Sequence, residues 1–242
     1  MITFYASPSE ITVQHRITEH VFNRFGIDAN NTCQIIENTA LTEINPDFLV
    51  AILNVFCNYE DVDINLFSKY PVPVVVDYLV RSHKYYMEKI LPEIGQSIAI
   101  LLSNYPKSHP LLENLYKFYF KYKVDLQEHF NEEEDTLFLY ANSLYKARFF
   151  KKEISFFIEF LQKNSIDDFV ETHSDTVENL SNIINVLLQY EPPKTNRSSF
   201  RILLEKLKNF EYDLNIHAFI EDRVLITKLY NLEKNIKLEV NN

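Results

Sequence analysis

Apolar residues recur every three or four positions along most of this chain, the spacing of one face of an α-helix. Proline and polar clusters separate these stretches. The pattern predicts an all-α protein. Long helical stretches follow the first 70 residues, and we expect them over Val74 to Asn104, Ser108 to Tyr145, Lys146 to Ile166, Asp167 to Gln189 and Ser198 to Asn231. Pro92 should kink the first of them, because proline lacks an amide donor.

The first 70 residues break into shorter helical pieces. Asn45 followed by Pro46 is a favourable helix start, since the missing amide of proline costs nothing in the first turn. A packed group of short helices needs its own core, for which we expect Phe22, Phe25, Ile35, Leu49, Ile52 and Phe56. The chain should therefore divide into a small helical domain, residues 1–70, and a four-helix bundle, residues 71–242.

Composition narrows the possible functions. The chain has only two glycines, Gly26 and Gly95, and they lie far apart. Phosphate-binding and dinucleotide-binding loops need several glycines close together, so both are excluded. Few glycines also disfavour hairpin-rich barrels and sandwiches. A formal charge of −10 offers no basic face for nucleic acid, which favours a small soluble partner or ligand.

Cysteine usage and the N-terminus indicate the compartment. Two cysteines, Cys33 and Cys57, are too few for a disulfide framework and too far apart for a CxxC site. The start of the chain lacks the basic and apolar regions of a signal peptide, and no stretch is long and apolar enough to span a membrane. We therefore expect a cytoplasmic protein without a membrane partner.

Four of the seven histidines form two pairs placed symmetrically about predicted turns. The midpoint of His83 and His129 falls in YPKSHP, and the midpoint of His173 and His217 falls in YEPPKTNRS. Residues equidistant from a turn lie at the same height in an antiparallel helix pair. Each pair is therefore expected to share one depth in the bundle.

The second histidine of each pair is followed four residues later by a glutamate, Glu133 or Glu221. Residues at this spacing lie on one helix face and can reach one metal ion. Four imidazoles and two carboxylates suit two adjacent cations, because each carboxylate can bridge. Iron fits best, with manganese or zinc possible, and the open positions suit a bridging oxide or hydroxide and a small diatomic ligand.

We expect the remaining histidines, and the acidic residues around Glu133, to have structural or surface roles. His15 and His20 should be surface or packing residues, and His109 should be structural beside Pro110. In the run NEEED, residues 131–135, only Glu133 is expected on the same helix face as His129. The other acids of that run are expected on a solvated face, and they are Glu132, Glu134 and Asp135.

These motifs resemble those of the iron-sulfur cluster repair di-iron family, the repair of iron centres proteins, whose fold is a hemerythrin-like HHE cation-binding bundle. The segments HPLLENLYKFYFKYKVDLQEHFNEEEDTLF and YEPPKTNRSSFRILLEKLKNFEYDLNIHAFIEDRVL are similar to two family segments. The resemblance covers most of the chain and implies an up-down four-helix bundle after a small N-terminal domain. It gives every family ligand position a match: His83, His129, Glu133, His173, His217 and Glu221.

The resemblance implies a function. It indicates repair of iron-sulfur clusters damaged by nitric oxide or oxidants, with two iron ions as cofactor and iron-sulfur proteins as partners, in a monomer or homodimer. The family typically has two adjacent cysteines after GID, whereas this chain has only Cys33 there, which we expect to be a buried apolar residue. Two alternatives stay open: a hemerythrin-like protein that binds or senses O₂ or NO, and a scaffold stabilised by its metal. The sequence leaves open whether the protein is an enzyme.

Overall fold

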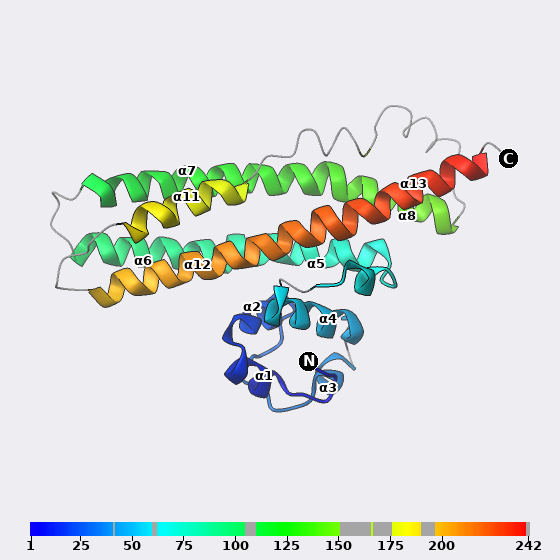
Figure 1. Ribbon diagram of the computed structural model, residues 1–242, viewed down its shortest axis with the longest axis horizontal. Coiled ribbons are helices and arrows are strands. Elements are labelled where there is room, and N and C mark those ends of the chain that lie inside the picture. Colours follow the sequence, from blue (N-terminus) through cyan, green and yellow to red (C-terminus); the bar gives the residue numbers. More distant parts are fainter. Residues whose placement is uncertain are drawn as a thin grey trace. The chain divides into compact units, whose positions relative to one another are not determined.

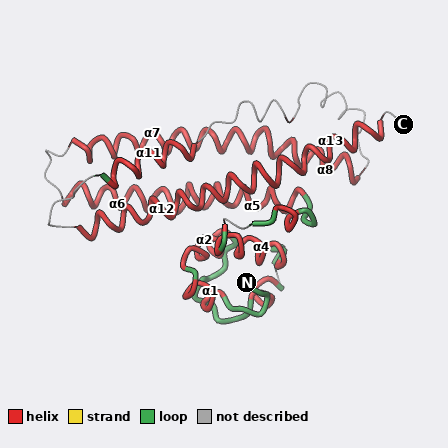
Figure 2. Tube along the Cα trace, in the orientation of Figure 1, coloured by secondary structure: helices red, strands yellow, loops and turns green. Residues whose placement is uncertain are grey.

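The computed structural model describes residues 1–40, 42–59, 62–104, 110–150, 166, 176–189 and 197–240. Every regular element in these ranges is helical, which confirms the all-α prediction (Figure 2). No helix in the described ranges is long and apolar enough to cross a membrane. The chain forms two compact units. The first unit comprises residues 1–82, 136–172 and 216–242, and the second comprises residues 83–135 and 173–215. The expected domain boundary after residue 70 stays a prediction.

The N-terminal part of the first unit consists of short helices. They are α1 (Pro8–Gln14), α2 (Glu19–Arg24), α3 (Ile35–Thr39) and α4 (Pro46–Cys57), with 3₁₀ turns at Arg16–Thr18 and Ile64–Phe67. The predicted start of α4 is confirmed, since the Asn45 side chain accepts a hydrogen bond of 3.0 Å from the Phe48 N–H. All six predicted core residues are at most 8% exposed, which confirms that these helices share a core.

The cysteine at residue 33 corrects one expectation. Cys33 is exposed in the loop before α3, whereas we expected a buried apolar residue. Two asparagines fix this loop: the Cys33 N–H donates to Asn31 Oδ1 at 2.8 Å, and Asn38 Nδ2 donates to the Cys33 carbonyl at 2.9 Å. Because the neighbouring Ile35 fills the core instead, the thiol is left at the surface.

The second unit contains a four-helix bundle. Helices α6 (Leu91–Asn104), α7 (Pro110–Glu133), α11 (Thr176–Leu188) and α12 (Arg197–Phe219) run side by side (Figure 1). One apolar cluster joins all four, and its members include Ile98, Leu126, Leu187 and Leu203, each at most 2% exposed. At a few kcal/mol for each fully buried side chain, this cluster is the main source of stability in the unit.

Three of the long helices continue through a π-helical segment. Tyr86–Ile90 joins α5 (Val72–Tyr85) to α6, Glu134–Phe138 joins α7 to α8 (Leu139–Phe150), and Ile220–Leu225 joins α12 to α13 (Ile226–Val240). The continuous helix predicted from Val74 to Asn104 is therefore confirmed. Its irregularity lies just before Pro92, which cannot donate the amide bond of a regular turn. The helix predicted over Lys146 to Ile166 lies mostly outside the described residues.

The C-terminal helix is longer than expected. We expected the last helix to end near Asn231, but α13 continues to Val240. Glu233 is 5% exposed and accepts hydrogen bonds from the Tyr140 hydroxyl of α8 and from the Ile166 N–H, the latter at 3.2 Å. Burial of this carboxylate within the first unit fixes α13 against α8, a contact that the polar appearance of the tail concealed.

Gly95 is required by close packing. A Cβ atom at this position would lie 2.5 Å from the hydroxyl oxygen of Tyr119, which donates a hydrogen bond of 2.8 Å to the Leu91 carbonyl. Gly95→Ala should therefore lower the free energy of unfolding by about 1–3 kcal/mol, the usual cost of overpacking, although alanine gains up to about 1 kcal/mol in helix propensity. Urea unfolding would measure the change, and Tyr119→Leu in the same chain should recover part of it. A Gly95→Ala variant as stable as the parent would contradict this account.

Candidate metal centre

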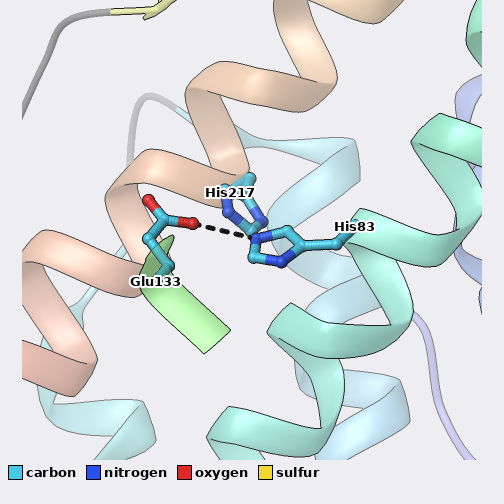
Figure 3. Close-up of side chains that lie close together, drawn as sticks. All are labelled: His83, Glu133 and His217. Carbon is cyan, nitrogen blue, oxygen red and sulfur yellow. Dashed lines mark ion pairs between the residues drawn. The ribbon is translucent and has the colours of Figure 1, made fainter. Parts of the chain in front are cut away.

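Three buried side chains from three helices meet at one point. His83 near the end of α5, Glu133 at the end of α7 and His217 on α12 each offer a ligand atom, and these atoms lie within 4.8 Å of one another (Figure 3). The three residues are 2%, 5% and 4% exposed. A carboxylate is seldom buried without a compensating positive charge, so this group has the composition of a cation site.

The two oxygens of the Glu133 carboxylate face two different imidazoles. Its Oε2 lies 3.1 Å from His83 Nε2, and its Oε1 lies 2.8 Å from His129 Nε2. The contact with His129 is the i,i+4 pairing that the HxxxE spacing predicts. A carboxylate with one oxygen turned to each of two histidines is suited to bridging two cations, because each oxygen can bind a different ion.

The second predicted HxxxE pair is also formed. His217 Nε2 lies 3.6 Å from Glu221 Oε2, and Glu221 is only 2% exposed. Of the six predicted ligands, the structure therefore groups three directly and places His129 and Glu221 beside members of that group. The sixth, His173, lies outside the described residues, as do the two midpoints, residues 106 and 195. Whether all six bind metal stays a prediction.

Glu134 has a contact that the sequence did not predict. Glu132, Glu134 and Asp135 are all exposed, as expected for the acidic run. Glu134 Oε1 nevertheless lies 2.9 Å from His83 Nδ1. A carboxylate on the second ring nitrogen orients an imidazole and directs Nε2 to the metal, the usual arrangement around histidine ligands. The contact joins α5 to the end of α7, so spacing within one helix could not reveal it.

Each π-helical segment adjoins a predicted ligand. Tyr86–Ile90 begins three residues after His83, Glu134–Phe138 follows Glu133 directly, and Ile220–Leu225 contains Glu221. Single π turns inside α-helices occur frequently at functional sites, because the extra residue turns side chains away from the regular helical phase. Three such turns beside one group of polar residues indicate that the helices are shaped around this site.

Aromatic packing holds the His83 ring. The ring stacks on Phe130 at 3.9 Å between centroids and 11° between planes, and Phe130 also contacts Tyr86 at 5.9 Å. The Tyr86 hydroxyl donates a hydrogen bond of 2.7 Å to Asp213 Oδ1, and both residues are fully buried. The sequence singled out neither Tyr86 nor Asp213. The stacked Phe130 ring covers one face of the imidazole and limits its rotation, and Tyr86 packs against Phe130 in turn.

Two carboxylates beside His83 favour its protonated form. Burial opposes the charged imidazolium, but hydrogen bonds to Glu133 and Glu134 outweigh it and raise the pKa of His83 above its ordinary value. A metal ion that binds Nε2 therefore competes with a proton for that nitrogen.

Metal affinity should consequently fall as pH decreases. Above the raised pKa of His83 the imidazole is neutral and available, whereas below it protons compete with the metal. We expect each decrease of one pH unit below that pKa to weaken binding by up to about tenfold for each proton displaced. Calorimetric titration in buffers of different ionisation enthalpy would measure the protons released. Affinity that does not change between acid and neutral pH would contradict this expectation.

The chain is similar to a cluster repair protein. It is 22% identical to the iron-sulfur cluster repair protein ScdA of Staphylococcus haemolyticus (strain JCSC1435) over 231 residues, which cover 94% of this chain and 99% of that protein. No protein-family model matches the chain, and no solved structure matches it. The similarity supports the repair family that the motifs resemble and extends beyond the HxxxE segments to nearly the whole chain.

The donor set fits a metal of intermediate softness. Imidazole nitrogens and carboxylate oxygens suit iron, manganese or zinc, and none of the grouped side chains is a thiolate, which disfavours a structural zinc site. Glu133 and Glu221 are buried, so bound ions would lie in a medium of low dielectric constant. The two carboxylates would offset part of their positive charge.

Proposed function

We propose that this protein belongs to the iron-sulfur cluster repair di-iron family and repairs clusters damaged by nitric oxide or oxidants. The observation that carries the proposal is the buried group of His83, Glu133 and His217, whose ligand atoms lie within 4.8 Å of one another. Similarity to a cluster repair protein over 94% of the chain supports it.

The proposed cofactor is a pair of iron ions. His83, His129, His173 and His217 would be the neutral ligands, and Glu133 and Glu221 would be the bridging carboxylates. The two oxygens of Glu133, turned to His83 and His129, support this assignment. Iron ions in such a site supply reversible one-electron chemistry and affinity for diatomic ligands. The chain itself holds the carboxylates buried, orients His83 through Glu134 and limits access of water.

The proposed partners are iron-sulfur proteins in the cytoplasm. Neither nucleic acid nor a membrane is proposed as a partner, since the net charge of −10 would oppose binding to either polyanionic surface. The protein would act as a monomer or homodimer.

A second candidate function is reversible binding or sensing of NO or O₂. Cys33 favours it, because the segment that carries two adjacent cysteines in the repair family has a single exposed thiol here. A protein that only binds a diatomic ligand would not need thiols to transfer iron. The two functions differ in whether iron leaves the protein.

Cluster recovery distinguishes the two functions. The reduced protein would be mixed anaerobically with a nitrosylated iron-sulfur protein, and recovery of the cluster absorbance would be followed over time. Repair predicts faster recovery than with the Glu133→Ala variant, together with loss of iron from the protein. Equal recovery with both proteins, while NO binds reversibly and the iron is retained, would contradict repair and support the binding function.

A further inference from the structure

The first unit contains a cavity that none of the predicted metal ligands line. Its volume is about 450 Å³, within the range of small-molecule sites. The 3₁₀ turn Ile64–Phe67, the start of α5, the end of α8 and the junction of the π-helical segment Ile220–Leu225 with α13 form its walls. Nothing in the proposed metal chemistry uses this cavity.

The charged residues that line the cavity are all cationic. They are Lys69, Arg223 and Lys228, and no acidic residue accompanies them in the described lining, although the chain has 34 acidic residues against 24 basic ones. Lys69 is neutralised by an ion pair with Asp47. Arg223 and Lys228 form no ion pair with any side chain of the described ranges. The cavity therefore presents two uncompensated positive charges in an acidic protein.

Lys228 is held in place without a counter-charge. Its Nζ donates a hydrogen bond of 2.9 Å to the Ser68 carbonyl, and the side chain is half-buried. Burial lowers the pKa of Lys228, because no carboxylate offsets the loss of hydration. An anion in the cavity would supply that offset and would strengthen binding in the partly desolvated site.

The other walls are apolar and aromatic. Phe67, Val72 and Val224 form a buried floor, each at most 3% exposed. On α8 the ring centroids of Tyr145 and Phe149 lie 4.6 Å apart, and Phe149 is 58% exposed. An apolar ligand body could cover this exposed ring, and aromatic surfaces contribute strongly to such binding.

We propose that this cavity binds a small organic anion, with a carboxylate or phosphate head between Arg223 and Lys228 and an apolar body against Phe67 and the Tyr145–Phe149 ring pair. The site is independent of the proposed repair function, because it uses none of the predicted metal ligands.

Calorimetric titration of the full chain tests the proposal. The probes are 2-naphthoate, 2-naphthyl phosphate and the neutral analogue 2-naphthamide. We expect one site per chain, with at least one of the two anions binding about tenfold or more tightly than the amide, the difference expected from charge-assisted hydrogen bonds. Tighter binding of the carboxylate or of the phosphate would identify the head group.

Matched variants locate the bound anion. Arg223→Gln and Lys228→Gln should each weaken binding of the better anion about tenfold, whereas Lys234→Gln, an exposed cation on α13 outside the cavity, should leave it unchanged. Arg223 is exposed, so its variant should fold even if loss of the Lys228 bond to Ser68 disturbs the other. Circular dichroism would verify this. Equal affinity for the amide, unchanged affinity in Arg223→Gln, or absence of saturable binding by both anions would overturn the proposal.

Discussion

Replacing Glu133 by alanine will remove most of the bound iron. Glu133 is buried and faces both His83 and His129, so its loss deprives two predicted ions of a shared ligand. Removing a residue that only hydrogen-bonds to a metal ligand typically lowers metal affinity about 10–100-fold. Glu133 is itself a predicted ligand, so we expect its removal to lower metal affinity at least about 100-fold. Iron content of the variant, purified after growth in ample iron, would fall well below the two ions per chain that we propose for the parent.

The matched control is Glu128→Ala. Glu128 is exposed on the same helix, five residues earlier, so this variant removes an equal charge without touching the group. It should retain the iron content of the parent. If Glu128→Ala and Glu133→Ala retained equal amounts of iron, or if the parent contained none, the proposed metal site would be wrong.

Iron will also stabilise the folded chain strongly. The protein buries the carboxylates of Glu133 and Glu221 beside histidines, and a cation that binds there adds its binding free energy to folding. At free metal about 1,000 times the dissociation constant, the free energy of unfolding should rise by about 4 kcal/mol. Anaerobic urea unfolding with and without Fe²⁺ would measure the increase.

Two controls separate specific binding from general charge screening. Mg²⁺ at equal concentration should give little stabilisation, because it prefers oxygen ligands and retains its waters. The Glu133→Ala variant should gain little stability from Fe²⁺. An increase of equal size with Mg²⁺, or in that variant, would show that the stabilisation arises elsewhere.

Much of the fold could be predicted because it depends on local rules. The six core residues of the N-terminal helices follow from apolar spacing, and the start of α4 follows from an asparagine and a proline in sequence. The two HxxxE pairs, including His217 with Glu221, are likewise contacts within one helix, fixed by four-residue spacing. Such features need no knowledge of how helices are placed against one another.

The features that sequence reasoning missed are contacts between helices. Glu134 reaches His83, and Glu233 reaches Tyr140, because of the particular rotation and height of two packed helices. Residue spacing within one helix predicts neither contact. In the sequence, an acidic residue that contacts another helix looks the same as one that only faces solvent. The expectation for Cys33 was wrong for a different reason. Its small apolar side chain suggested burial, whereas hydrogen bonds of its backbone with Asn31 and Asn38 fix its loop at the surface.

The π-helical segments decide where these helices can lose a residue. A π-helical turn is wider than an α-helical turn and absorbs one extra residue, so deleting one residue from Glu134–Phe138 would restore regular hydrogen bonding and leave α8 on nearly the same face. A deletion in the regular part of α7 would instead rotate everything beyond it by about 100°, the angle of one residue in a helix. Tyr140 and Leu144, both at most 1% exposed, would then leave the core. The consequence of a one-residue deletion therefore depends on whether it falls inside or outside a π-helical turn.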